Sequence, residues 1–467
     1  MRYISTRGAA PARDFDGVLL AGLAEDGGLF VPEAWPVFSP AELRAMRGLP
    51  YAELAARVMA PFVCGGAVTM PDLQDMCRAA YRGFDRAAVV PLVQLEPGLF
   101  ALELFHGPTL AFKDLALQVA GRLFDHVLEA RDQRVTIVGA TSGDTGSAAI
   151  EACRDRARVD IAILHPEGRT SEVQRRQMTT VRAPNVLNIA VHGNFDDCQD
   201  LVKAMFADAP FREDLRLSAV NSINWARIAG QIPYFVAAAL ALGAPDREVA
   251  VSVPTGNFGN VLAAWAAKKM GVPIARFIVG SNANDILARF LASNDMSAAG
   301  VVETVSPSMD IQVSSNFERL LFEFQHRDAV VTARTMADFR ASGRMAVDEP
   351  VWRAVRREFT GFTLGDEATL AEIGRIERDY GYIADPHSAI GIAAARACSP
   401  IGIPVIAAAT AHPAKFPDAM ERAIGVRPTL PERLKDLYHR PEVFQRSSNR
   451  LAEVQALVRN FAHRNNA

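Results

Sequence analysis

The sequence lacks the features of several large classes of protein. Its net charge is −3, so it has no basic excess to neutralise a nucleic-acid backbone, and no nucleic-acid partner is expected. Its longest apolar stretches, 232–243 and 401–411, are shorter than a bilayer-spanning helix and contain proline or polar residues, so no membrane association is expected. The first residues carry charge with no apolar segment behind it, which predicts a chain without a secretory signal.

Cysteines and nucleotide-binding motifs are also scarce. The five cysteines are scattered, odd in number and never spaced as a CxxC pair, so neither a disulfide framework nor a metal site is expected. Such cysteine usage suits a reducing compartment, and we predict a cytoplasmic location. The GxxxxGK[ST] and GxGxxG phosphate motifs are missing, which ranks a nucleotide-dependent kinase or dehydrogenase last among the enzyme classes.

Lysine is also rare in this chain, and its rarity makes the motif around Lys113 informative. The chain has six lysines against 44 arginines. An amine can lose its proton and become a nucleophile, whereas a guanidinium cannot. A chain that contains so much more arginine than lysine is therefore expected to use lysine where a nucleophilic amine is required. Lys113, in the motif HGPTLAFKD (106–114), lies beside Phe112 and near Leu115, and an apolar setting lowers the pKa of an ammonium group. Lys113 is therefore a candidate Schiff-base lysine, and Lys415 is a second one. The alternative for Lys113 is a surface lysine at the start of a helix.

The pattern of apolar residues predicts an α/β fold preceded by helices. Residues 1–92 have apolar positions at helical spacing, as in 15–23, 40–46 and 51–62. From residue 134 onward, β-branched runs alternate with alanine-rich segments, which is the pattern of a largely parallel, doubly wound sheet. The expected strands and helices, in chain order, are 135–138, 147–153, 161–164, 249–253, 261–269, 277–279 and 404–408.

Three loops follow predicted strands and carry candidate binding groups. The loop TSGDTG (141–146) and the loop PTGNFGN (254–260) each place glycines and hydroxyls before a helix, where free N–H groups and the helix dipole favour an anion. The alternative for each is a tight turn in which glycine serves geometry alone. Thr410 ends a third strand, and its alternative is a threonine that caps the next turn. Two anion sites, an imine lysine and a hydroxyl suit pyridoxal 5'-phosphate (PLP) beside an anionic substrate.

The residues themselves resemble the threonine synthase family of fold-type II PLP enzymes, which are similar to the tryptophan synthase β subunit. The similarity runs over nearly the whole chain. The motifs that carry it are GLAEDGGLFVP (22–32), ELFHGPTLAFKD (103–114), ATSGDTG (140–146), GNFDDCQ (193–199), NSIN (221–224), SVPTGNFG (252–259) and TAHPAKF (410–416). Thr255 stands where serine is more usual, and this change keeps the hydroxyl.

The resemblance implies the reaction and the roles of the candidate residues. O-phospho-L-homoserine and water would give L-threonine and phosphate by β,γ-elimination and replacement, the last step of threonine biosynthesis. Lys113 would form the imine with the cofactor, Thr410 would face the pyridine nitrogen, and Asp144 would lie near the phenolic oxygen. The remaining assignments are Gly256, Asn257, Phe258, Gly259 and Asn260 for the cofactor phosphate, and Thr141, Ser142, Gly143 and Thr145 for the substrate carboxylate.

The group that holds the substrate phosphate stays open at the level of sequence. Arg227 is a candidate because arginine binds phosphate bidentately, and its alternative is a solvated arginine on a helix. Ser314, Asn316 and Arg319 are further candidates in the same role.

The resemblance also implies a division into domains. A helical N-terminal domain would cover residues 1–92. A large PLP-binding α/β domain would cover 93–130 and 222–430, and a smaller α/β domain with the TSGDTG loop would cover 131–221. A helical tail without assigned chemistry would cover 431–467.

Two other functions remain as alternatives to threonine synthesis. A phospholyase on a related phospho-amino acid would share the fold and the cofactor but release a keto acid. A non-catalytic PLP- or amino-acid-binding protein would keep the fold, although an intact Lys113 and both loops argue against it. The expected partner is a small-molecule substrate, and the chain is expected to be a monomer or a homodimer.

Overall fold

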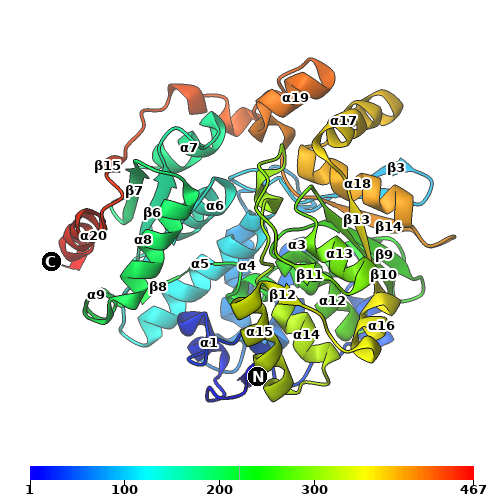
Figure 1. Cartoon of the computed structure of the whole chain (residues 1–467), viewed down its shortest axis with the longest axis horizontal. Coiled ribbons are helices and arrows are strands. Elements are labelled where there is room, and N and C mark those ends of the chain that lie inside the picture. Colours follow the sequence, from blue (N-terminus) through cyan, green and yellow to red (C-terminus); the bar gives the residue numbers. More distant parts are fainter. Residues whose placement is uncertain (220, 467) are drawn as a thin grey trace.

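Two β-sheets, each covered by helices, form the framework of the molecule (Figure 1). The structure is a computed structural model that describes residues 1–219 and 221–466. Residues 220 and 467, which belong to the predicted small domain and tail, lie outside the described residues. The alternating strands and helices expected from the sequence are present, so the predicted α/β class is confirmed. No helix in the described part is long and apolar enough to cross a membrane.

The larger sheet has six strands in the order β13-β10-β9-β14-β4-β3. All neighbours are parallel except β3 and β4, which pair antiparallel at one edge. The central strand β9 is buried along its whole length, as expected when helices cover both faces of a parallel sheet. In chain order the strands are β3 (Leu92–Glu96), β4 (Leu99–Glu103), β9 (Val249–Pro254), β10 (Ile274–Ser281), β13 (Phe359–Thr363) and β14 (Val405–Ala409).

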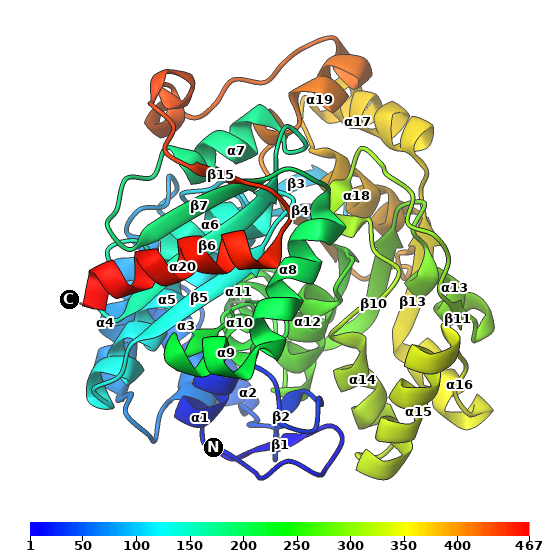
Figure 2. The ribbon, with the colours of Figure 1, turned by 60° about the vertical axis from the view of Figure 1, so that its left-hand side comes forward.

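The smaller sheet has five parallel strands in the order β15-β7-β6-β5-β8. Its strands are β5 (Val135–Ala140), β6 (Val159–Pro166), β7 (Val186–Val191), β8 (Leu217–Ser218) and β15 (Gln445–Ser447). Strand β15 comes from the predicted tail and pairs with β7. Helix α20 (Leu451–Asn466) follows it and packs beside α8 (Phe195–Ala207) over this sheet (Figure 2). We therefore propose that the tail belongs with the smaller domain.

The N-terminal segment is helical, as predicted, with one addition. Its helices are α1 (Phe15–Ala21), α2 (Pro40–Ala45), α3 (Tyr51–Val63) and α4 (Met70–Tyr81). The sequence analysis missed the antiparallel pair β1 (Tyr3–Ser5) and β2 (Phe30–Pro32). Strands of three residues are too short to show an alternating pattern, so periodicity could not find them.

The other helices connect the strands and cover the sheets. They are α5 (Lys113–Ala130), α6 (Asp144–Cys153), α7 (Glu172–Thr179), α9 (Ala209–Asp214), α10 (Trp225–Ala229), α11 (Ile232–Ala241), α12 (Gly259–Lys269), α13 (Ile286–Ser293), α14 (Phe317–Phe324), α15 (Ala329–Ser342), α16 (Glu349–Glu358), α17 (Asp366–Tyr380), α18 (Pro386–Cys398) and α19 (Pro417–Ile424). Short 3₁₀ turns are η1 (Pro307–Met309), η2 (Pro413–Lys415), η3 (Glu432–Leu434) and η4 (Leu437–His439), and β11 (Met296–Ser297) pairs with β12 (Arg344–Met345).

The candidate residues lie where parallel strands end. Strand β5 leads into the loop before α6, β9 into the loop before α12, and β14 into Thr410. Residues that follow β4 reach α5, whose first residue is Lys113. Strands β4, β9 and β14 run parallel in the larger sheet, so the residues that follow them lie at one edge of it. The loop before α6 comes from the smaller sheet.

Candidate active site

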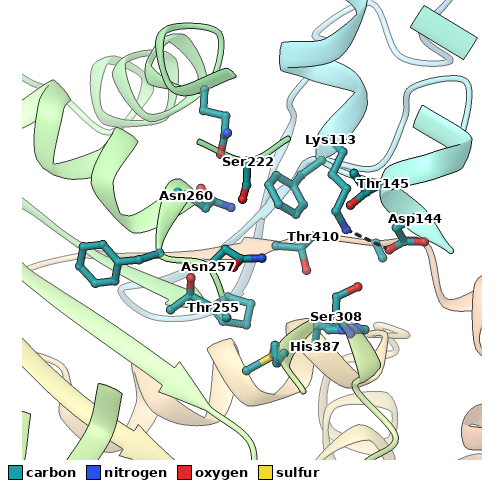
Figure 3. A pocket seen from close by; sticks show the side chains of 18 of the residues that line it. Lys113, Asp144, Thr145, Ser222, Thr255, Asn257, Asn260, Ser308, His387 and Thr410 are labelled. Carbon is teal, nitrogen blue, oxygen red and sulfur yellow. Dashed lines mark hydrogen bonds and ion pairs between the residues drawn. The ribbon is translucent and has the colours of Figure 1, made fainter. Parts of the chain in front are cut away.

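One pocket gathers candidates from all three loops and from α5 (Figure 3). Its lining includes the whole 254–260 loop together with Lys113, Asp144, Thr145 and Thr410, and Arg227 lies on its wall. Figure 3 shows Lys113 and Thr410 facing the same space, with Asn257 and Asn260 approaching from the β9 side. Groups from positions 113 to 410 of the chain thus share one cavity.

Lys113 occupies the first position of α5, with its amine in the pocket. Burial lowers the pKa of the Lys113 ammonium, and the nearby charges of Lys415 and Arg227 lower it further, while Asp144 opposes them. A helix N-terminus also disfavours a positive charge. The ring of Phe112 lies 5.2 Å from Nζ. The site therefore makes the neutral amine, which is the nucleophilic form, easier to reach than it is for an exposed lysine.

Asp144 is the first residue of α6, and it contacts both candidate lysines. Its Oδ2 lies 3.4 Å from Lys113 Nζ, and its Oδ1 lies 2.7 Å from Lys415 Nζ. Gln174 Nε2 donates to the same Oδ1 at 2.8 Å. Burial would raise the pKa of Asp144, but the two ammonium groups outweigh it and hold that pKa well below its usual range. Asp144 is therefore an ionised carboxylate.

The loop between β9 and α12 is shaped as an anion cradle. Phe258 precedes α12 with φ of 61°, a left-handed conformation that is costly for a bulky residue and is held here by full burial. No side chain caps the helix, so its first N–H groups stay available. The Asn260 Nδ2 group is buried without a partner among the described residues. At Gly256 a Cβ atom would lie 3.0 Å from the Ser308 carbonyl oxygen, so only glycine fits comfortably.

Thr410 directly follows β14, and both its backbone N–H and its carbonyl are hydrogen-bonded. Its N–H donates to Ser388 Oγ at 2.9 Å, and its carbonyl accepts from Phe112 N at 2.8 Å. These bonds fix the residue between β14 and the Lys113 segment. Its hydroxyl makes no hydrogen bond to the described residues and lies in the pocket lining, ready for a ligand atom.

The 141–146 loop divides into a part that lines the pocket and a part that does not. Thr145 and Asp144 line it, whereas Thr141, Ser142 and Gly143 do not. Thr141 is buried, and its Oγ1 accepts the N–H groups of Gly143 and Gly146 at 3.0 and 2.9 Å. That hydroxyl therefore shapes the loop. Residues 141–143 remain a prediction as substrate contacts.

Arg227 and Arg319 are both buried arginines, but their guanidinium groups differ. Arg227 lies on the pocket wall, and its Nε and Nη1 have no partner among the described residues. Burial lowers its pKa to about 10. Arg319 donates to the carbonyls of Phe30 and Ile223 at 2.9 and 2.6 Å and to Asn316 Oδ1. Arg227 is therefore free to bind an anion, and Arg319 is committed to structure.

The other two candidates for the substrate phosphate brace the cofactor loop. Ser314 Oγ donates to the Gly256 carbonyl at 2.7 Å, and Asn316 Nδ2 donates to the Asn257 carbonyl at 3.0 Å. Neither lines the pocket. Their contacts hold the backbone of the anion cradle in place.

Replacing Arg319 with methionine is expected to lower the free energy of unfolding by about 3 kcal/mol, because two buried acceptors and one partly buried acceptor lose their donor. The shift of the urea unfolding midpoint measures this. Arg353, an exposed arginine of α16, serves as the control, and its methionine variant should change stability by less than about 0.5 kcal/mol. An unchanged midpoint for Arg319→Met would contradict the structural role.

The pocket also contains residues that the sequence analysis left unassigned. They are Phe112, Ser222, Gln231, Ser308, Met309, His387 and Ala411. Ser222 stands in the NSIN motif, so that resemblance could have suggested it. His387 Nδ1 lies 2.9 Å from Asp385 Oδ1, and its Nε2 lies 3.2 Å from the Ser308 backbone nitrogen, so both ring nitrogens are held in place. Ser308 and Met309 follow no strand, and the sequence held no signal for them.

Lys415, unlike Lys113, does not reach the pocket. Its side chain is 0% exposed, and it is not part of the pocket lining. Its amine donates to the Thr109 carbonyl at 2.7 Å as well as to Asp144. Of the two candidate lysines, only Lys113 faces the cavity.

Three family descriptions match successive parts of the chain. "Threonine synthase N terminus" matches residues 2–81, "Pyridoxal-phosphate dependent enzyme" matches residues 86–407, and "Threonine synthase, C-terminal" matches residues 388–458. A threonine synthase from Pseudomonas aeruginosa is 53% identical over 466 residues, covering 99% of both chains. The chain belongs to the threonine synthase family. The resemblance noted from the motifs is thereby confirmed.

Further members of the threonine synthase family agree with this placement. The threonine synthase of Methylobacillus glycogenes is 40% identical, with 95% of this chain and 96% of that protein covered. The structure of PLP-bound threonine synthase from Brucella melitensis has a TM-score of 0.97 at 51% identity. That of yeast threonine synthase has a TM-score of 0.94 at 37% identity, and each comparison covers 99% of both chains. The predicted fold-type II architecture is confirmed.

Proposed function

We propose that the pocket is the active site of a PLP-dependent threonine synthase, which converts O-phospho-L-homoserine and water to L-threonine and phosphate. One observation carries the proposal: the Lys113 amine, the uncapped N-terminus of α12 and the unpartnered guanidinium of Arg227 share one cavity. A nucleophilic amine between two anion-binding groups suits a phosphorylated cofactor beside a phosphorylated substrate. Membership in the threonine synthase family supports the same reaction.

The residues present fit PLP. Lys113 would hold the aldehyde carbon, and the loop of Gly256, Asn257, Phe258, Gly259 and Asn260 would hold the phosphate through N–H groups that no side chain caps. The free hydroxyl of Thr410 would face the ring nitrogen, and Asp144 would lie near the phenolic oxygen. When bound, the cofactor supplies an aldehyde for amino groups and a ring that accepts negative charge. Thr410 is neutral, so it would leave the ring nitrogen unprotonated.

Lys113 is assigned the proton transfers. Its neutral amine, favoured by burial, takes the proton from the substrate Cα and then moves a proton at Cβ. Loss of the Cβ proton expels the phosphate from Cγ and leaves a Cβ–Cγ double bond. Lys113 would return one proton to Cγ, water would add its oxygen at Cβ, and a proton would return to Cα. One amine that reaches these adjacent carbons would need no second base.

Arg227 is assigned the substrate phosphate, and the 141–145 loop is assigned the substrate carboxylate. The guanidinium belongs to a residue of the pocket wall and has two nitrogens without a partner among the described residues, and arginine binds phosphate bidentately. A released phosphate kept on Arg227 could orient the water that attacks Cβ. Thr145 lines the pocket. Thr141 accepts the Gly146 N–H of α6, and the two N–H groups before it, those of Asp144 and Thr145, have no acceptor among the described residues and would face a carboxylate.

The working form is proposed to be a monomer or a homodimer. The five cysteines are free thiols, and this supports a cytoplasmic location.

The products decide between this function and its closest alternative. The PLP-loaded protein is expected to release threonine and phosphate in equal amounts from O-phospho-L-homoserine, measured by amino-acid analysis and a phosphate assay. Phosphate accompanied by 2-oxobutyrate in place of threonine would identify a phospholyase. An imine absorbance band without any turnover would identify a binding protein.

A further inference from the structure

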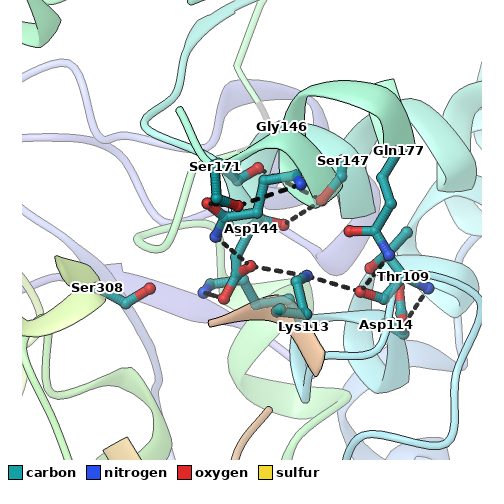
Figure 4. Close-up of polar contacts among 12 residues, drawn as sticks. Thr109, Lys113, Asp114, Asp144, Gly146, Ser147, Ser171, Gln177 and Ser308 are labelled. Carbon is teal, nitrogen blue, oxygen red and sulfur yellow. Dashed lines mark hydrogen bonds and ion pairs between the residues drawn. The ribbon is translucent and has the colours of Figure 1, made fainter. Parts of the chain in front are cut away.

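A buried polar network surrounds the face of Asp144 that turns away from the pocket (Figure 4). Four segments distant in sequence meet there: the 106–114 motif, the start of α6, helix α7 and the turn η2. Figure 4 shows Asp144 in the centre, with Thr109 and Asp114 on one side and Ser171 on the other. Asp144 contacts two lysines there, Lys113 and Lys415.

Asp144 is the one carboxylate that both lysines contact, and the two contacts are unequal. Lys415 Nζ lies 2.7 Å from Oδ1, which is the distance of a strong charge-assisted hydrogen bond. Lys113 Nζ lies 3.4 Å from Oδ2, which is a long and weak contact. Because electrostatic attraction falls with distance, the carboxylate stabilises the ammonium group of Lys415 more than that of Lys113.

The surroundings of Lys415 strengthen this inequality. Its amine also donates to the Thr109 carbonyl at 2.7 Å, and Gln177 Nε2 donates to the same oxygen at 3.1 Å. Thr109 itself is fixed by Asp114, which accepts its N–H at 2.8 Å and its hydroxyl at 2.6 Å. The acceptors of Lys415 are thus held rigidly, and an ammonium group with two fixed acceptors is well accommodated even when buried.

We propose that Lys415 is a positioning residue of this active site: it engages Asp144 through the shorter of the two lysine contacts and thereby leaves Lys113 as the amine that gives up its proton. This inference rests on the proposed role of Lys113 in the reaction. Lys415 touches neither cofactor nor substrate, because it lies outside the pocket lining.

The charged groups that act on Lys113 are Asp144 from α6, Lys415 from η2 and Arg227 from α10. Asp114 from α5 acts on Lys415, and His387 from α18, which is bonded to Asp385, also lines the pocket. Burial is the main cause of the lowered pKa of Lys113, and Asp144 is the principal charge that opposes it. Removing the charge of Lys415 would give Asp144 to Lys113 alone and remove a repulsion. Both changes favour protonated Lys113.

The test is the titration of Lys113 in the full chain freed of cofactor. Trace acetylation with acetic anhydride, read by peptide mass spectrometry against exposed Lys203, reports the fraction of neutral Lys113 as a function of pH. In Lys415→Met, Lys113 is expected to acetylate about tenfold more slowly at neutral pH, corresponding to a rise of about one pKa unit. In Asp144→Asn the shift is expected in the opposite direction. The exposed lysine variant Lys435→Met should leave the titration unchanged.

A second variant and a second readout test the inference even if Lys415→Met does not fold. Lys415→Gln removes the charge but can still donate to Thr109 and Asp144, so it should fold and shift Lys113 in the same direction if Lys415→Met does not fold. In the PLP-loaded protein, the pH midpoint of the visible cofactor band should rise with both variants. An unchanged or lowered midpoint for Lys113 in a folded Lys415 variant would overturn the inference. Because acetylation is read without substrate, this failure is distinct from a failure of the proposed reaction.

Discussion

The PLP-loaded Lys113→Ala variant is expected to lose threonine synthesis by a factor of at least about 10³, since one group serves as nucleophile and as the base at two carbons. The measurement compares threonine and phosphate release by the wild-type protein and the variant. Borohydride reduction adds a second readout, because it should attach the cofactor covalently to the peptide with Lys113 and to no peptide in the variant.

The variant should still fold. Asp144 keeps the shorter bond to Lys415 and the bond from Gln174, so no carboxylate is left buried without a partner. Lys203→Ala is the control, because Lys203 is exposed and pairs only with Asp200. Turnover within tenfold of wild type in Lys113→Ala would remove Lys113 from the mechanism, and Lys415 would then be the lysine to test.

The residues that the sequence could place are those tied to strand ends. Asn257 and Thr410 follow strands whose β-branched and alanine-rich patterns are plain in the sequence, and the parallel pairing of β9 with β14 brings such ends together. Lys113 was identified in another way, by the scarcity of lysine and by its motif. Local chemistry also identified the 254–260 loop, because a glycine-rich turn before a helix leaves N–H groups free. The fold class followed from the same alternation of strands and helices.

The contacts that depend on packing could not be read from the sequence. Lys415 and Thr109 are 306 residues apart, and no pattern within either segment announces their hydrogen bond. Ser308 and His387 enter the pocket from η1 and α18, neither of which follows the strand–loop–helix pattern. The pairing of β15 with β7 likewise joins a three-residue strand to a distant sheet, and so short a strand has no detectable period.

The roles of Arg227 and Arg319 could be predicted from the sequence only in part. Residue type and a helical setting made both candidates for the substrate phosphate. Only the folded structure shows that Arg319 donates hydrogen bonds to two backbone carbonyls. Two nitrogens of Arg227, in contrast, have no partner among the described residues. An unpaired buried guanidinium costs stability, and such a cost is typical of functional sites.

Arg227→Met is therefore expected to change activity and stability in opposite directions. The value of kcat/KM for O-phospho-L-homoserine should fall about 10²- to 10³-fold, as for other buried charge pairs that lose one partner. Inhibition by inorganic phosphate should weaken in parallel. The substrate-free protein should gain about 1 kcal/mol of stability, because a buried charge without a partner is replaced by an apolar side chain of similar length.

Arg319→Met is the matched control, since it makes the same exchange at a second buried arginine whose donors are all used. It should lose stability where Arg227→Met gains it. Arg227→Lys should recover only part of the activity, because an ammonium group keeps the charge but cannot bind phosphate bidentately. If Arg227→Met instead loses stability and keeps its sensitivity to phosphate, the guanidinium serves the fold, and the phosphate must be held by other groups of the pocket wall.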